Sequence, residues 1–225
     1  ANATGTLNML VAARDAKVKR FVYASSSSVY GDAILFPQLE SHKPAPVSPY
    51  AASKLCGEHY CILFTKGMGL ETVSLRYFNV FGPRQDPESQ YSAVIPKFME
   101  SAYLGRSLEV HWDGRQSRDF THVGDIVQAN LRAAATREGV GEAFNIANGE
   151  THSLLDLIAV IESIVGRRLE RRHSPMRAGD VRKTKADISR ARRLLAFKPR
   201  FDFEGGLRDT WKYFETAYFK NGRKG

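Results

Sequence analysis

The chain has 225 residues, of which 43% are hydrophobic and 25% are charged, a balance typical of a globular protein. This length can hold one large domain or two small ones. No apolar stretch approaches the roughly 20 residues that a membrane-spanning helix needs, so we expect no membrane partner.

The net charge of +9 is concentrated in one segment of the chain. Residues 167–200 contain thirteen Lys and Arg against three Asp and Glu, which gives this segment a charge of +10. A basic segment can bind nucleic acid, but this one lacks the interleaved aromatic residues that stack on bases. We therefore expect a solvated surface and no nucleic-acid partner, with one or two of the Arg residues binding an anionic diphosphate.

Periodicity and turn residues predict helices that alternate with strands. The predicted helices are 3–17, 49–66, 94–104, 123–136, 153–165, 187–196 and 204–219, and the predicted strands are 20–25, 72–77, 108–111 and 143–147. The helix at 153–165 has the clearest signal, because Ser153 and Asp156 fit a capping box and Gly166 follows its end. Alternating strands and helices predict an α/β fold with a parallel sheet.

Two features of the N-terminal half indicate chemistry. A predicted strand ends in the run Ser25–Ser28, and open α/β sheets bind ligands at the carboxyl ends of their strands. Pro49 suits the first turn of the following helix, on which Tyr50 and Lys54 share one face. An ammonium close to a phenol favours the phenolate, which can take a proton from an alcohol. With a Ser hydroxyl on the same oxygen, the pair predicts oxidation or reduction at a carbinol carbon.

Simpler readings exist for several of these residues. The chain contains nine Tyr, so one Tyr-x-x-x-Lys pattern can arise by chance. The position of this pattern after a predicted strand that ends in a Ser run nevertheless favours a catalytic role. Cys56 and Cys61 are spaced poorly for a disulfide or a metal site, which predicts reduced thiols and a cytoplasmic protein. His122 and His152 have no partners for metal binding, and we predict structural roles for both and no metal.

Seven short sequence motifs follow one another along the chain in the order found in a known family. They are Asn2–Asn8, Ser25–Gly31, Tyr50–Lys54, Arg76–Arg84, Arg118–Val123, Asn145–Gly149 and Arg177–Asp180. With these stretches, the chain resembles the extended short-chain dehydrogenase/reductase family, and within it the nucleotide-sugar 4-epimerases of the UDP-glucose and UDP-N-acetylglucosamine type. The resemblance implies a partial Rossmann-like parallel sheet with a smaller C-terminal α/β substrate-binding region.

The resemblance also implies a division of the chain. Residues 1–78 correspond to the C-terminal part of the NAD domain, and residues 79–225 mainly to the UDP-sugar region, with 115–150 returning to the sheet. The sequence lacks the Gly-rich turn that binds the dinucleotide pyrophosphate in this family. We therefore expect an N-terminally truncated member of the family that by itself binds NAD weakly or not at all.

The resemblance implies a role for each residue near the Ser run. In such 4-epimerases, NAD takes hydride from C4 while a Tyr takes the O4 proton, and the transient 4-keto sugar is reduced on its other face. By motif, Tyr50 is the acid/base and Lys54 holds the nicotinamide ribose. Tyr77 lies near the nicotinamide, unless it is simply a core residue of its strand. Ser26 binds O4 with Ser27 as its neighbour, although adjacent Ser residues leave this assignment open by one position.

The other implied contacts belong to the nucleotide and the sugar. Asn79, Arg118 and Arg177 match contacts to the diphosphate, Ala93, Val94 and Lys97 the segment after the nucleotide, Glu109 and His111 the uracil pocket, Asp180 the uridine ribose, and Thr184 the border of the C2 substituent. Bidentate Arg donors suit phosphate oxygens. A small residue at 184 leaves room for an N-acetyl group. The alternatives are surface charges for the Arg residues, a turn for Asp180 and an outward-facing Thr184.

Related enzymes help to choose the reaction. Nucleotide-sugar 4,6-dehydratases and UDP-glucuronate decarboxylases carry carboxylates where this chain has Ser27 and Ser28, which favours epimerisation at C4. The alternatives are a UDP-glucuronate 4-epimerase, or a fragment that only binds nucleotide sugar or dimerises. Helices 3–17 and 49–66 match the dimer-forming pair of the family, so we expect a homodimer. The candidate interface residues are Leu7, Leu10, Val11, Leu55, His59 and Ile62, of which most could equally pack on the sheet.

Overall fold

The computed structural model describes residues 2–88, 94–176 and 181–219. The helices are α1 (Asn2–Asp15), the 3₁₀ helix η1 (Ser27–Tyr30), α2 (Pro49–Gly67), α3 (Val94–Leu104), α4 (Val123–Ala135), α5 (Leu154–Val165), α6 (Ser189–Leu194), α7 (Phe203–Tyr213) and the π-helical η2 (Phe214–Tyr218). The strands are β1 (Phe21–Ser26), β2 (Thr72–Tyr77), β3 (Val80–Phe81), β4 (Leu108–His111), β5 (Ser117–Arg118), β6 (Thr121–His122), β7 (Ala143–Ile146), β8 (His152–Ser153) and β9 (Arg171–Ser174).

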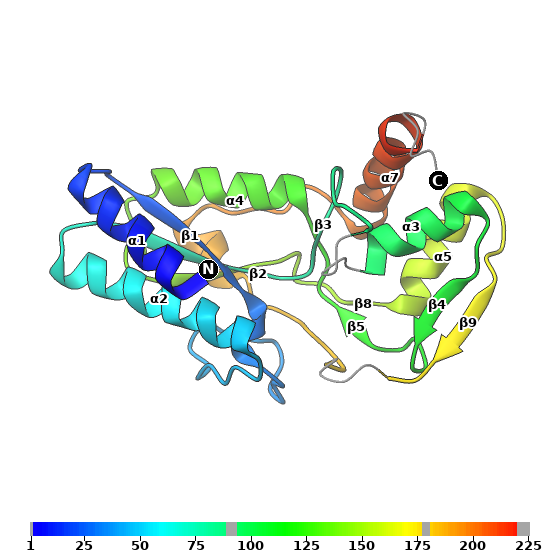
Figure 1. Ribbon diagram of the computed structural model, residues 1–225, viewed down its shortest axis with the longest axis horizontal. Coiled ribbons are helices and arrows are strands. Elements are labelled where there is room, and N and C mark those ends of the chain that lie inside the picture. Colours follow the sequence, from blue (N-terminus) through cyan, green and yellow to red (C-terminus); the bar gives the residue numbers. More distant parts are fainter. Residues whose placement is uncertain (1, 89–93, 177–180, 220–225) are drawn as a thin grey trace.

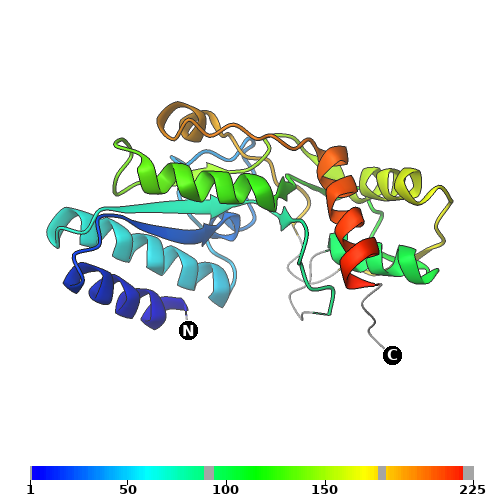
Figure 2. The same cartoon turned by 90° about the horizontal axis from the view of Figure 1, so that it is seen from above.

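The central sheet consists of three parallel strands in the order β1–β2–β7. Helix α2 packs on one face of the sheet with α1 against it, and α4 covers the other face (Figure 2). Val73 and Leu75 of β2 are fully buried between these layers, as the middle strand of a parallel sheet requires. The sheet confirms the α/β, Rossmann-like fold that the alternation of elements predicts.

Helix α2 begins where the sequence predicts. Ser48 lies just before it in an extended conformation, and its side chain accepts a hydrogen bond from Ala51 N at 3.1 Å. Pro49 occupies the first helical position, where its missing N–H costs nothing. This start places Tyr50 in the first turn, at the end of the sheet where β1 and β2 finish.

A second, smaller layer of elements lies beside the sheet (Figure 1). Its core is formed by α3, α5 and α7 with β4, which pairs in parallel with β9. Ser153 and Asp156 form the predicted capping box of α5, and Gly166 ends the helix in the left-handed conformation with φ of 71°. Leu157 and Ile158 are fully buried on its inner face.

Short pairings connect the two parts and were not predicted. β3 pairs with β6, β5 pairs with β8, and isolated bridges join Gln38 to Ala186 and Ser117 to Lys183. These strands are only one or two residues long, so they leave no alternating pattern in the sequence. They bring the loop after β1, the β5 strand and the extended segment 182–187 side by side.

The C-terminal predictions were too long. Helix α6 covers only Ser189–Leu194, because Ala196 adopts a left-handed φ of 49° just beyond it. The predicted helix at 204–219 is α-helical to Tyr213 and continues as the π turn η2, closed by a bond from Phe219 N to Phe214 O. Within the described ranges, no helix is long and apolar enough to cross a membrane.

Candidate active site

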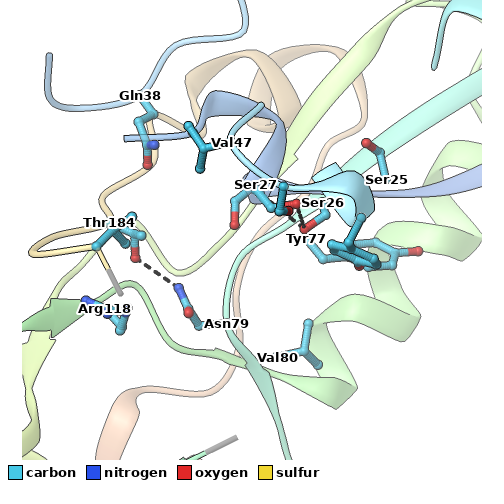
Figure 3. A pocket seen from close by; sticks show the side chains of 15 residues that line it. Ser25, Ser26, Ser27, Gln38, Val47, Tyr77, Asn79, Val80, Arg118 and Thr184 are labelled. Carbon is cyan, nitrogen blue, oxygen red and sulfur yellow. Dashed lines mark hydrogen bonds between the residues drawn. The ribbon is translucent and has the colours of Figure 1, made fainter. Parts of the chain in front are cut away.

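A cavity of about 510 Å³ lies at the carboxyl ends of β1 and β2 (Figure 3). The described residues that line it are Ser25, Ser26, Ser27, Ser28, Gly31, Gln38, Val47, Ser48, Tyr50, Tyr77, Asn79, Val80, Arg118, Val181 and Thr184. Of the predicted site residues, the structure brings Ser26, Ser27, Tyr50, Tyr77, Asn79, Arg118 and Thr184 together here. These residues span more than 150 positions of the sequence, so only the fold gathers them.

The Ser run turns sharply at the end of β1. Ser26 caps η1, and its Oγ accepts hydrogen bonds from Ser28 N at 3.2 Å and from Ser28 Oγ at 2.9 Å. The Ser25 hydroxyl instead donates to the buried carboxylate of Glu58, and its side chain points away from Ser26 in Figure 3. Ser26, Ser27 and Ser28 therefore line the cavity with hydroxyls free of this buried contact, and the Ser28 hydroxyl is donated to Ser26.

Tyr50 and Lys54 lie on the same face of α2, as their spacing predicts. The Tyr50 side chain is 51% exposed and lines the cavity. The Lys54 ammonium lies 5.8 Å from the centre of the Tyr50 ring and donates to Ala24 O at 2.9 Å. Partial burial lowers the pKa of Lys54 below its usual range. The phenol of Tyr50 therefore lines the same cavity as Ser26, with the Lys54 cation near its ring.

Tyr77 and Asn79 extend the cavity wall from the end of β2. The Tyr77 hydroxyl donates to Asn130 Oδ1 at 3.0 Å, and burial raises the pKa of this phenol. Asn79 Nδ2 donates to Thr184 Oγ1 at 2.9 Å. The same Thr184 oxygen accepts from Asp119 N at 3.1 Å, so the Thr184 hydroxyl is engaged within the protein.

Asp119 is a structural centre of this wall, although the sequence gives it no separate role. Its fully buried carboxylate accepts hydrogen bonds from the backbone N–H groups of Asn148 at 2.9 Å, Gly149 at 3.2 Å and Ala186 at 3.1 Å. Burial raises the pKa of Asp119 to about 7, even though these bonds favour the carboxylate. Asp119 thereby holds the segment that carries Thr184. One indication of its importance was present in the sequence, because Asp119 belongs to the stretch Arg118–Val123 that contributes to the family resemblance.

Gln38 is a second wall residue that sequence reasoning missed. It lies in the polar loop between β1 and α2, and no pattern distinguishes it from its neighbours. Arg118, by contrast, was predicted and lines the cavity, with one Nη1–H donated to Ser117 O at 3.0 Å.

Other predicted contacts lie elsewhere. Val94 and Lys97 are in the first turn of α3, and Glu109 and His111 are on β4, so none of them lines the described cavity. His111 Nδ1 lies 2.6 Å from Ser174 Oγ on β9. The predicted Ala93, Arg177 and Asp180 lie outside the described residues.

The two histidines that were assigned structural roles pack against aromatic rings. His122 is buried, its ring lies 3.9 Å from that of Phe201, and its Nδ1 accepts from Gly124 N. Burial lowers the pKa of His122, which favours the neutral ring that this acceptor needs. His152 stacks on Phe203 with ring centres 4.0 Å apart. Within the described ranges, no group of three or more His, Cys, Asp or Glu residues is arranged to hold a metal ion.

Comparison with known proteins gives consistent matches. The chain is 36% identical over 216 residues to the UDP-glucose 4-epimerase of Mycolicibacterium smegmatis, covering 96% of this chain and 68% of that protein. Among solved structures, it is similar to the UDP-N-acetylglucosamine 4-epimerase of Methanobrevibacter ruminantium in complex with UDP-N-acetylmuramic acid, with 39% identity, a TM-score of 0.91, and coverage of 95% of this chain and 68% of that one.

A third match is the UDP-glucose 4-epimerase of Thermotoga maritima with UDP-glucose, at 35% identity and a TM-score of 0.92, covering 96% of this chain and 70% of that one. The chain thus spans about two thirds of the length of each of these relatives. The model of the NAD dependent epimerase/dehydratase family matches residues 1–147. The match covers more than half of the chain and agrees with the parallel sheet and its cavity, so this chain belongs to the NAD dependent epimerase/dehydratase family.

Proposed function

We propose that the natural protein interconverts C4 epimers of a UDP-hexose or UDP-N-acetylhexosamine, with NAD as cofactor. The observation that carries this proposal is the composition of one cavity wall. Ser26 and Tyr50 share the cavity beside Lys54, and its described lining contains no Asp or Glu. Dehydration needs a further base that removes the C5 proton, so the described side chains suit proton transfer at one hydroxyl.

The described residues fit one end of NAD. Lys54 has three N–H donors and uses one on Ala24 O, so it can also bind the hydroxyls of the nicotinamide ribose. The aromatic side chain of Tyr77 lines the same cavity and can pack against the nicotinamide ring. The pyrophosphate would need a Gly-rich turn that this sequence does not contain. We propose that residues 1–78 contribute to the NAD domain and 79–225 mainly to the UDP-sugar region, with 115–150 returning to the sheet.

NAD bound there would supply the acceptor, and later the donor, of the C4 hydride. Tyr50 takes the O4 proton as the C4–O4 bond gains carbonyl character and gives it back when the alcohol re-forms. Lys54 holds its ammonium 5.8 Å from the centre of the Tyr50 ring, next to the phenol that exchanges this proton. Ser26 holds O4 by a hydrogen bond, with Ser27 beside it. Asn79 and Arg118 are assigned to the diphosphate, whose oxygens accept amide and guanidinium donors.

The nucleotide end is assigned to residues outside this cavity. We propose that Ala93, Val94 and Lys97 follow the nucleotide, that Glu109 and His111 border uracil, and that Arg177 and Asp180 contact the diphosphate and the ribose. Thr184 borders the C2 substituent. UDP-glucuronate is the second candidate substrate, because Arg182, Lys183 and Lys185 surround Thr184 in the sequence and a cation can bind a C6 carboxylate. Solved UDP-glucuronic acid 4-epimerase of Bacillus cereus is also similar to this chain, at 33% identity.

We also propose a homodimeric protein of the cytoplasm. Cys56 and Cys61 are both free thiols, which a reducing compartment allows. Helices α1 and α2 expose the apolar side chains of Met9 and Leu63, 60% and 58% exposed respectively. A second copy can cover such side chains.

The test of the reaction is Tyr50→Phe in the complete gene product. This change removes the acid/base but keeps the ring, so epimerisation of UDP-glucose should fall by roughly 10²–10⁴-fold. Tyr60→Phe is the matched control, because Tyr60 lies on the same helix but packs toward α1 and β1, and it should keep near-normal turnover. Near-normal epimerisation by Tyr50→Phe would show that the assigned mechanism is wrong.

A further inference from the structure

Gln38 combines deep burial with an unused polar group. The residue is only 2% exposed, yet it lines the cavity that contains Tyr50 and Ser26. Its side-chain Oε1 is buried and has no hydrogen-bond partner among the described residues. Buried polar atoms are almost always paired, because an unpaired one loses its hydration without compensation. An unpaired oxygen on a cavity wall therefore points to a ligand that supplies the donor.

The main chain of Gln38 is held independently of this side chain. Gln38 N donates to Lys185 O at 2.7 Å, and Gln38 O accepts from Asp187 N at 2.9 Å and from Asn145 Nδ2 at 2.8 Å. In these contacts Gln38 uses only its backbone N and O, which hold the loop around Gln38 against the segment 185–187 and Asn145. The side-chain amide is thus positioned by its surroundings but is not needed to hold them.

The direction of the amide agrees with a role in binding. Figure 3 shows the amide end of Gln38 directed into the space that Ser27, Thr184 and Asn79 surround. The Thr184 hydroxyl already accepts two hydrogen bonds within the protein, from Asn79 Nδ2 and Asp119 N. Gln38 Oε1 accepts no hydrogen bond among the described residues, so it is an acceptor on this part of the wall that a ligand can engage.

Gln38 Oε1 can only accept a hydrogen bond, so it must face a part of the substrate that carries a donor. An ionised diphosphate offers no hydrogen to donate, whereas a hexose offers several hydroxyls. O4 is already assigned to Ser26 and Tyr50. Resting on the function proposed above, we propose that Gln38 determines sugar specificity, with Oε1 accepting a hydrogen bond from a donor on C2, C3 or C6 of the hexose.

The test is a substitution that removes the acceptor and keeps the volume, Gln38→Met. Binding of UDP-glucose and of its 2-, 3- and 6-deoxy analogues is measured by calorimetry on the complete gene product with NAD, in a Tyr50→Phe background that slows turnover. With Gln38 present, one analogue should bind roughly 10-fold to 100-fold more weakly than UDP-glucose, because it leaves the buried acceptor unpaired. With Met at this position, the affinity for UDP-glucose should fall by a similar factor, while the affinity for that analogue should fall little further.

Gln116→Met is the matched control. Gln116 is also buried and also has an unpaired Oε1, but its Nε2 donates to His111 O and it does not line the cavity. This variant should keep the ratio of UDP-glucose to analogue affinities. Thermal unfolding of each variant shows whether it is folded, and Gln38→Asn, which keeps the amide but shortens it, serves as a second variant if Gln38→Met does not fold.

Two results would overturn the inference. If Gln38→Met weakens UDP-glucose and every analogue equally, or weakens none of them, then Oε1 does not recognise a sugar donor. In either case UDP-glucose still binds the parent protein, and the proposed function stands. If the parent protein binds no UDP-glucose at all, the proposed function is wrong and this inference is wrong with it.

Discussion

Thr184 contributes to both the shape of the cavity and the hydrogen bonding of its wall. Its side chain borders the cavity, while its hydroxyl accepts hydrogen bonds from Asn79 and Asp119. Substitutions at this position therefore change two properties, the size of the cavity and the hydrogen bonding of its wall. The two effects separate when a large residue is compared with a residue of the same size that cannot accept a hydrogen bond.

We predict that Thr184→Tyr lowers kcat/KM for UDP-N-acetylglucosamine relative to UDP-glucose by at least about 10-fold, because the larger ring occupies space that the N-acetyl group needs. Thr184→Val keeps the size but loses the acceptor, so it should affect both substrates to the same extent. Epimerisation rates with the two sugars at matched concentrations give the comparison. An unchanged ratio in Thr184→Tyr would mean that Thr184 does not border the C2 substituent.

At the scale of elements, α2 is fixed to the sheet by a buried ion pair. Glu58 and Arg76 are 3% and 5% exposed, and they are joined by two hydrogen bonds of 2.9 and 2.7 Å. Ser25 donates to the same carboxylate, and Arg76 donates to the Tyr30 hydroxyl at 2.9 Å. Glu58 lies one turn beyond Lys54 on α2. The network therefore links α2, which carries Tyr50, to the strand that ends in the Ser run.

We predict that Glu58→Gln lowers the free energy of unfolding by about 3 kcal/mol, because it leaves the Arg76 charge buried without a counter-charge. The double variant Glu58→Leu with Arg76→Met removes both charges, so it should recover most of this stability. Denaturant unfolding of the complete gene product measures both values. A Glu58→Gln variant as stable as the parent protein would contradict the view that this pair anchors α2.

At the scale of the whole molecule, the proposed dimer surface differs in part from the residues predicted for it. Leu10 is fully buried in the core formed by α1, α2 and β1, so it is not available to a partner and that prediction was wrong. Leu7 and Val11 are partly buried against the same core. His59 is exposed, and so is Leu63, which was not predicted. Helix periodicity identifies an apolar face but does not tell which of two neighbours covers it.

We predict that Leu63→Lys shifts the protein from dimer toward monomer, because a charge at a covered apolar contact costs more than one in water. Leu131→Lys is the control. Leu131 is 68% exposed on α4, which covers the opposite face of the sheet from α2, so this variant should remain dimeric (Figure 2). Light scattering across a range of concentrations gives the masses. A parent protein that stays monomeric at high concentration would rule out the homodimer.

Much of the fold could be predicted because it rests on local patterns. The pairing of Tyr50 with Lys54, the start of α2 at Pro49 and the capping box of α5 each involve residues within four positions of one another. Helix geometry then sets which side chains share a face. The alternation of strands and helices was sufficient for the parallel sheet, since parallel strands require crossover connections. The short pairings that close the cavity lack such a pattern.

The sequence by itself thus determined the sheet and the helix that carries Tyr50 and Lys54, and it predicted a reaction at the carbinol carbon of an alcohol. Only the tertiary structure decided which other side chains share the cavity. Gln38 meets Lys185 and Asn145, and Asp119 meets Asn148 and Ala186, across long stretches of chain. Such contacts depend on burial and on the meeting of remote segments, and a polar residue in a loop shows neither until the chain is folded.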